Sequence, residues 1–150
     1  MSKNLSVIEQ QKKIVAEFGQ LLNWEDKYKR IIELGKKLPP FPEEFQTEQL
    51  KVKGCQSQVW LKAQLAPTGE LILTGDSDAL LVKGLLALML DIFSNNKPQE
   101  ILEAPMEFLK ELGLDSHLSP SRSNGVFAMI KQIRLYAQAF LMMEKSKIKN

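Results

Sequence analysis

Cys55 is the residue whose type could carry covalent chemistry, and it is the only cysteine in the sequence. A thiolate is the nucleophile in sulfur exchange and in cysteine hydrolases. A single cysteine excludes an internal disulfide framework and any CxxC metal or redox pair. It therefore points to exchange with another protein or a small molecule rather than to a self-contained disulfide cycle.

The stretch around Cys55 is polar and reads KVKGCQSQ from residue 51 to residue 58. An inert cysteine is usually a small buried hydrophobe within an apolar run, which is the alternative here. Gly54 permits backbone angles that present the next side chain at the tip of a loop. Lys51 and Lys53 would bring cations near the sulfur and favour the thiolate. We therefore expect Cys55 on a loop, where functional residues concentrate.

The single histidine, His117, offers a second use for the thiol. A cysteine nucleophile and a histidine base within hydrogen-bond reach, with a third group to orient the base, would make a thiol hydrolase or acyl transferase. Nothing in the sequence establishes that proximity, and His117 lies where surface or capping residues are common. Because the sequence contains only one histidine and one cysteine, it also lacks the usual ligand set of a metal site. The Cys55–His117 pair remains the alternative enzyme hypothesis.

Two further polar clusters can be read either as helix caps or as surfaces for a partner. The stretch SPSRSNG at 119–125 resembles a helix N-terminus with several capping residues. Arg122 lies in its first turn, where a cation opposes the helix dipole. Such an arginine also suits contact with a carboxylate, phosphate or thiolate. The cluster Asp76-Ser77-Asp78 predicts the cap of another helix, with an acidic patch facing a partner as the other reading.

The middle of the chain alternates with a period of two, which predicts strands with one face in the core. The connections are too short for crossovers, so the sheet should be antiparallel. Three strands are expected, at 50–53, 58–66 and 71–73, with a turn at 67–70. Trp60 falls on the face opposite Val59 and Leu61, where it would wall one side of a loop pocket.

Helical patterns flank these strands. A capping box begins at Ser6. A second helix begins at Asn23 and is expected to stop at Gly35 and the proline-rich stretch LPPFP at 38–42. The run from Leu80 to Ile92 is apolar on almost every side, which predicts a buried central helix. Further helix starts are expected at Pro98, Pro105 and Ser119-Pro120, with a helix stop at Gly113. The expected fold class is α+β, a small antiparallel three-stranded sheet packed with helices in a single domain at 1–150.

Composition excludes several classes of function. Twenty Lys and Arg against eighteen Asp and Glu give a net charge of +2, evenly mixed, which argues against a dedicated nucleic-acid binder. The N-terminal residues lack the apolar core of a signal peptide. The most apolar run, Ala79 to Phe93, contains Lys83 and Asp91 and is shorter than the roughly 20 residues of a membrane span. We expect a cytoplasmic protein with neither a nucleic-acid nor a membrane partner.

The residues around Cys55 resemble the cysteine motif of the SufE family, the sulfur-acceptor proteins of iron–sulfur cluster assembly. That motif is GCQSQVW at 54–60. Five more stretches resemble the family in the family's own order, from Trp24 into the last helix. They are WEDKY at 24–28, ELG at 33–35 with LP at 38–39, GDSD at 75–78, VKGL at 82–85, and SRS at 121–123 with Gly125.

The resemblance implies a partner of a pyridoxal-phosphate cysteine desulfurase. Cys55 would take the outer sulfur of the enzyme's persulfide and pass it to an iron–sulfur scaffold complex. The chain would stimulate the desulfurase by unloading it and would not be an independent enzyme. It would bind no cofactor, because the pyridoxal phosphate belongs to the partner. The implied fold is α+β and related to the IscU scaffold, and a homodimer is possible.

The residue patterns and the resemblance together lead us to expect roles for particular residues. Cys55 would be the persulfide acceptor. The residues expected to support it are Arg122, Gly54, Gln56 and Trp60. The residues expected to contact the partner are Asp76, Asp78 and Lys83. Three hypotheses thus remain: a sulfur carrier, a Cys55–His117 hydrolase, and an interaction module whose cysteine is inert.

Overall fold

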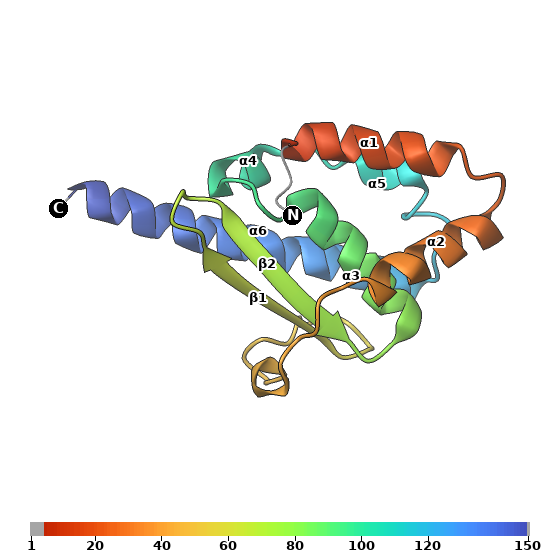
Figure 1. Cartoon of the computed structure of the whole chain (residues 1–150), viewed down its shortest axis with the longest axis horizontal. Coiled ribbons are helices and arrows are strands. Elements are labelled where there is room, and N and C mark those ends of the chain that lie inside the picture. The colour runs from red at the N-terminus through yellow and green to blue at the C-terminus, as the bar shows by residue number, and fades with distance from the viewer. Residues whose placement is uncertain (1–4, 150) are drawn as a thin grey trace.

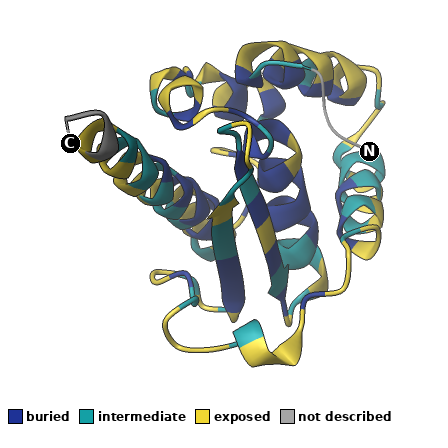
Figure 2. Cartoon of the chain, turned by 60° about the vertical axis from the view of Figure 1, so that its left-hand side comes forward, coloured by how far each residue is buried: buried dark blue, intermediate teal, exposed yellow. Residues whose placement is uncertain are grey.

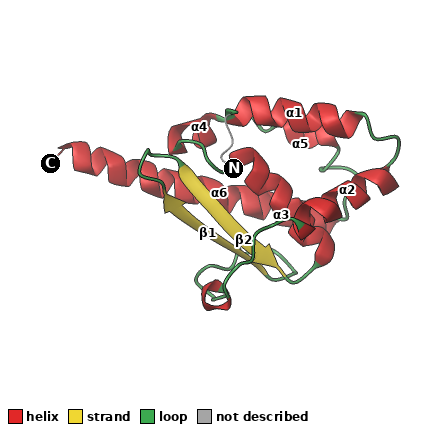
Figure 3. Cartoon of the chain, viewed as in Figure 1, coloured by secondary structure: helices red, strands yellow, loops and turns green. Residues whose placement is uncertain are grey.

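The computed structural model describes the backbone of residues 5–149 and the side chains of residues 5–146. Helices pack against one small antiparallel sheet, which confirms the predicted α+β class (Figures 1 and 3). The strands are β1 (Val59–Leu65) and β2 (Leu71–Ser77). The helices are α1 (Val7–Gly19), α2 (Trp24–Lys36), the short 3-10 turn η1 (Glu43–Phe45), α3 (Leu80–Phe93), α4 (Pro98–Glu103), α5 (Glu107–Leu112) and α6 (Pro120–Lys149).

The sheet has two strands within the described residues, so the expectation of three is wrong. The segment predicted at 50–53 forms an isolated bridge from Lys51 to Trp60 rather than a ladder. The backbone N–H of Val52 still donates to the carbonyl of Val59, at 2.8 Å. Directly afterwards the chain turns away through Gly54, whose φ is 95°. The segment is therefore too short to extend the sheet, although it covers part of the outer edge of β1.

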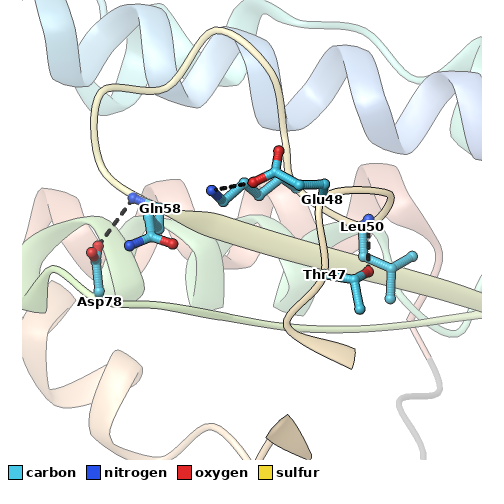
Figure 4. A network of polar contacts seen from close by, with 6 residues as sticks. Thr47, Glu48, Leu50, Gln58 and Asp78 are labelled. Carbon is cyan, nitrogen blue, oxygen red and sulfur yellow. Dashed lines mark hydrogen bonds and ion pairs between the residues drawn. The ribbon is translucent and has the colours of Figure 1, made fainter. Parts of the chain in front are cut away.

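The predicted cap at 76–78 is also wrong, because β2 continues through Ser77 and the N-cap of α3 is Ala79, without a side-chain hydrogen bond. Asp76 Oδ1 instead accepts the backbone N–H of Ser77 and forms an ion pair with Lys83 Nζ at 3.2 Å. Asp78 Oδ1 accepts the backbone N–H of Gln58 at 3.0 Å (Figure 4). This last bond joins the end of β2 to the residue just before β1, and so fixes one end of the loop that carries Cys55.

The buried central helix is confirmed as α3, which Figure 2 shows dark along most of its length. It lies very close to α2 at a pair of glycines. A Cβ atom on Gly84 would lie 2.2 Å from the carbonyl oxygen of Ile31, and one on Gly35 would lie 2.8 Å from the backbone nitrogen of Gly84. Gly35 does not stop α2, which continues to Lys36. Because Gly35 has no side chain, it allows α2 and α3 to approach each other closely.

The remaining helix ends follow the sequence with one exception. Ser6 and Asn23 cap α1 and α2, and Pro98 begins α4, as predicted. Pro105 does not begin a helix, because α5 starts after an N-cap at Met106. Gly113 ends α5 in the left-handed conformation, with φ of 77°. None of the described helices is long and apolar enough to cross a bilayer.

Replacing Gly84 with alanine should destabilise the protein by about 3 kcal/mol, the upper end of what overpacking costs, because the new Cβ would meet backbone atoms of α2 rather than a flexible side chain. Urea denaturation measures this change in the free energy of unfolding. Gly19→Ala is the matched control, since a Cβ there would meet nothing within 4 Å. Similar losses in both variants would contradict the close packing of α2 on α3.

Candidate functional site

Cys55 lies on the loop between the Lys51 bridge and β1, as predicted, and its side chain is partly buried. Its Sγ lies 3.7 Å from the carbonyl oxygen of Gly125, near the start of α6. A Cβ on Gly125 would also lie 3.7 Å from this sulfur, and one on Gly54 would lie 3.4 Å from the Cβ of Ala128. These are ordinary van der Waals distances, so the loop packs against the first turns of α6 without requiring glycine at 125, whereas the φ of 95° favours glycine at 54.

A pocket of about 710 Å³ surrounds the thiol and is formed by the loop, α2, the first half of α3 and the first turns of α6. The apolar part of its lining, which we call the apolar wall, includes Ile32, Leu80, Leu81, Val82, Leu85 and Met129. The polar part includes Gln56, Ser57, Ser119, Ser121 and Arg122. Cys55 thus lines a pocket that offers both apolar surface and hydrogen-bonding groups.

The structure brings only some of the expected site residues to this pocket. Gln56 and Arg122 line it together with Cys55, and Gly54 is the neighbour that turns the loop. Trp60 does not line it. The Trp60 side chain is only 7% exposed on β1, and its Nε1 has no hydrogen-bond partner among the described residues. The expectation that Trp60 walls the pocket is therefore not met.

The three residues expected to face a partner lie beside the pocket rather than in its lining. Asp76 and Lys83 form an ion pair, and both side chains are partly exposed. Asp78 is exposed and accepts the backbone N–H of Gln58. Asp78 and Lys83 are next in sequence to the lining residues Ala79 and Val82, and Asp76 is joined to this region by its ion pair with Lys83.

Sequence reasoning missed the apolar wall. Its residues come from α2, α3 and α6, all distant in sequence from Cys55. One pattern could have indicated it. A helix that is apolar on almost every side needs cover on every side, and the first turn of α3 lacks part of that cover, since Leu80 is 57% exposed.

Burial raises the pKa of the Cys55 thiol. The expectation that nearby lysines would favour the thiolate is therefore wrong for the resting protein. Lys51 forms an ion pair with Glu48, at 2.8 Å, and Lys53 is exposed. Arg122 reaches the pocket from an exposed position at the start of α6. At neutral pH the sulfur is consequently a protonated thiol, and attack on another sulfur requires removal of its proton.

The structure does not bring His117 to Cys55. The His117 ring stacks on Trp24, with centroids 4.5 Å apart, and its carbonyl accepts the hydroxyl of Tyr28 at 2.8 Å. His117 does not line the pocket, and no hydrogen bond joins its ring to the thiol among the described residues. Within the described part of the chain, no group of three or more His, Cys, Asp and Glu residues is placed to hold a metal ion.

The raised pKa of Cys55 predicts the pH dependence of its alkylation by iodoacetamide. The apparent pKa of the Cys55 thiol in the folded protein should exceed the value measured for the same chain in urea, where an unperturbed cysteine has a pKa of about 8.5. The reason is that burial penalises the charged thiolate and so lowers its population at any given pH. Initial rates followed by intact mass give both values. A folded value at or below the unfolded one would show that a cation stabilises the thiolate at rest.

Comparison with protein families and solved structures agrees with this arrangement. Residues 12–137 match the SufE family, described as an Fe-S metabolism associated domain. A protein from Thermus thermophilus, described as a hypothetical protein whose structure was determined in solution, has the same fold with a TM-score of 0.74. It is 24% identical, and the match covers 89% of this chain and 96% of that one. Because the family match spans most of the sequence and includes the loop of Cys55, the chain belongs to the SufE family of iron–sulfur metabolism.

Proposed function

We propose that this protein is a sulfur carrier, in which Cys55 accepts sulfur from the persulfide of a cysteine desulfurase and delivers it for iron–sulfur cluster assembly. Membership of a family associated with Fe-S metabolism supports this role. The observation that carries it is a single thiol on a loop, partly buried in a pocket with an apolar wall and an arginine at its rim. The protein has no second cysteine, so the sulfur must come from another molecule.

The transfer needs no oxidant or reductant. The Cys55 thiolate attacks the outer sulfur of the desulfurase persulfide, and a new sulfur–sulfur bond forms on Cys55. The original sulfur–sulfur bond breaks, and its electron pair leaves with the desulfurase cysteine as a thiolate. The number of persulfides is unchanged, and the proton lost by Cys55 balances the one taken up by the leaving thiolate. Pyridoxal phosphate acts only in the partner enzyme, and this chain needs no cofactor for the sulfur-transfer step.

The pocket suits a sulfur atom that must survive between two partners. A persulfide in water is exposed to reductants, whereas Cys55 is partly buried in a pocket with many apolar lining residues. About 710 Å³ leaves room for one further sulfur atom. The carrier requires a compartment in which thiols stay reduced, and we place it in the cytoplasm for that reason.

Arg122 is the residue best placed to assist. It lines the pocket from the first turn of α6, where its charge opposes the helix dipole. A guanidinium at the rim would attract the terminal sulfur anion of a persulfide or a carboxylate of the partner. Asp78 and Lys83 adjoin lining residues of the pocket in sequence, Asp76 pairs with Lys83, and we propose that these three residues contact the desulfurase.

Intact mass under non-reducing conditions tests the carrier role. After incubation with a cysteine desulfurase and cysteine, the wild-type protein should gain the mass of one sulfur atom. Cys55→Ser should gain none. His117→Ala should gain as much as the wild type, because His117 lies outside the pocket. Absence of sulfur on the wild type would refute the carrier role, and hydrolysis of an ester that required His117 would support the thiol hydrolase instead.

Substituting Arg122 tests its role separately from that of the thiol. Arg122→Ala should slow sulfur transfer about tenfold, because a hydrogen bond to a charged group contributes about 1.5 kcal/mol or more. Arg134→Ala is the matched control, since Arg134 lies on the same helix but outside the pocket. Desulfurase turnover with each variant gives the rates. If Arg122→Ala leaves both transfer and desulfurase binding unchanged, the proposed assistance is wrong.

A further inference from the structure

The outer edge of β2 directs backbone groups away from the sheet. On β1, the N–H of Leu61 donates to the carbonyl of Leu50 at 2.9 Å, and the Leu61 carbonyl accepts the hydroxyl of Tyr136 at 2.8 Å. The backbone of Leu61 therefore faces away from β2. Gly75 is its partner in the antiparallel register, so both backbone groups of Gly75 face away from β1. Leu73, two residues earlier, is oriented in the same way.

Part of this edge is hydrogen-bonded and part is unpaired; the unpaired part, at Leu73 and Gly75, is largely buried and reached through the groove that these residues line. At the hydrogen-bonded end, the N–H of Leu71 donates to the carbonyl of Asn96, and the N–H of Leu73 donates to Ser94 Oγ, at 2.8 and 2.9 Å. Beyond that point, three groups have no hydrogen-bond partner among the described residues. They are the carbonyl of Leu73 and the N–H and carbonyl of Gly75. An acceptor, a donor and an acceptor in this order are what an added strand would pair with.

The unpaired part of the edge forms one wall of this groove of about 610 Å³, which shares no residue with the Cys55 pocket. Segments of α1, the end of α2, the chain that follows it and the second half of α3 complete the groove. Its apolar lining includes Ile14, Phe18, Leu34, Leu38, Phe41 and Leu90. Backbone groups that open onto such a surface are poorly solvated, so pairing them with a peptide would be favourable.

Cations outnumber carboxylates among the residues that line the groove. Its cations are Lys13, Arg30, Lys37 and Lys62, of which Arg30 is paired with Glu33 at 3.7 Å. Its carboxylates are Glu17 and Asp91, and Asp91 Oδ2 already accepts the amide of Gln10 at 2.7 Å. This excess of cations complements acidic side chains and disfavours basic ones.

We propose that this groove binds an extended segment of a partner protein, which adds to β2 as a strand along Leu73–Gly75 and carries alternating apolar and acidic side chains. The free backbone groups would supply pairing, the apolar lining would take alternate side chains, and the cations would select acidic residues between them. Because α3 lines the groove with its second half and the thiol pocket with its first half, a partner held here would leave Cys55 accessible. The proposal does not depend on sulfur transfer.

The probe is a short synthetic peptide that alternates valine and glutamate, followed by NMR of the isotope-labelled full-length protein. In the free protein the amide of Gly75 should exchange with solvent at least about tenfold faster than the paired amides of Thr74 and Asp76. Millimolar peptide should shift the Gly75 signal and slow its exchange. A twin peptide methylated on alternate backbone nitrogens and a twin with lysine for glutamate should both fail. Equal binding of either twin, or no effect on Gly75, would overturn the proposal.

Charge reversal on α1 supplies a matched pair of variants. Lys13→Glu should weaken binding of the valine–glutamate peptide about fivefold, because Lys13 lines the groove. Lys12→Glu should leave binding unchanged, because its exposed neighbour Lys12 does not line the groove. Equal weakening would show that the overall charge attracts the peptide. If the Gly75 amide of the free protein became protected as protein concentration rose, the edge would pair with a second copy and the proposal would be wrong.

Discussion

The contact between the backbones of α2 and α3 at Gly84 is the constraint on which both concave surfaces depend. With a hypothetical Cβ only 2.2 Å from the carbonyl of Ile31, only glycine fits there without a shift of backbone. The two helices therefore lie close enough for α2 to border a pocket at each end of α3. Ile32 contributes to the wall around Cys55, and Leu38, just after α2, contributes to the separate groove. One steric requirement thus sets the shape of two surfaces.

Burial acts on Cys55 in two opposing ways. It shields the sulfur on one side, and it raises the pKa of the thiol, which lowers the thiolate population that could attack a persulfide. In the proposed carrier, reactivity would rise on contact with the desulfurase, either through movement of the loop into water or through the approach of a positive charge. The loop is fixed at one end by Asp78 and at the other by the hydrogen bond from Val52 to Val59, and between them Sγ lies 3.7 Å from the carbonyl oxygen of Gly125.

Local patterns in the sequence predicted what local physics determines. Capping at Ser6 and Asn23, the strand β1 and the loop position of Cys55 all depend on neighbouring residues, and all were predicted correctly. The predicted alternation of β1 is wrong at its start, because Trp60 is buried like its neighbours on the other face. The errors concern contacts across the fold. Asp78 has the appearance of a helix cap in sequence, but its partner is the N–H of Gln58 on another segment. Likewise, adjacency to lysines suggested a thiolate, whereas burial by α3 and α6 determines the pKa. No pattern near residue 55 contains that information.

One edge of the sheet is covered and the other is partly unpaired, and this difference determines which molecules can pair with the sheet. The edge of β1 is covered by the Lys51–Val52 segment and by the hydroxyl of Tyr136. An exposed edge invites pairing with another copy, and charged residues beside it are a common protection. The edge of β2 at Gly75 has cations around its groove, so a second copy would bring like charges together there. An acidic segment would meet no such repulsion, and the same charges that oppose self-association therefore favour a different partner.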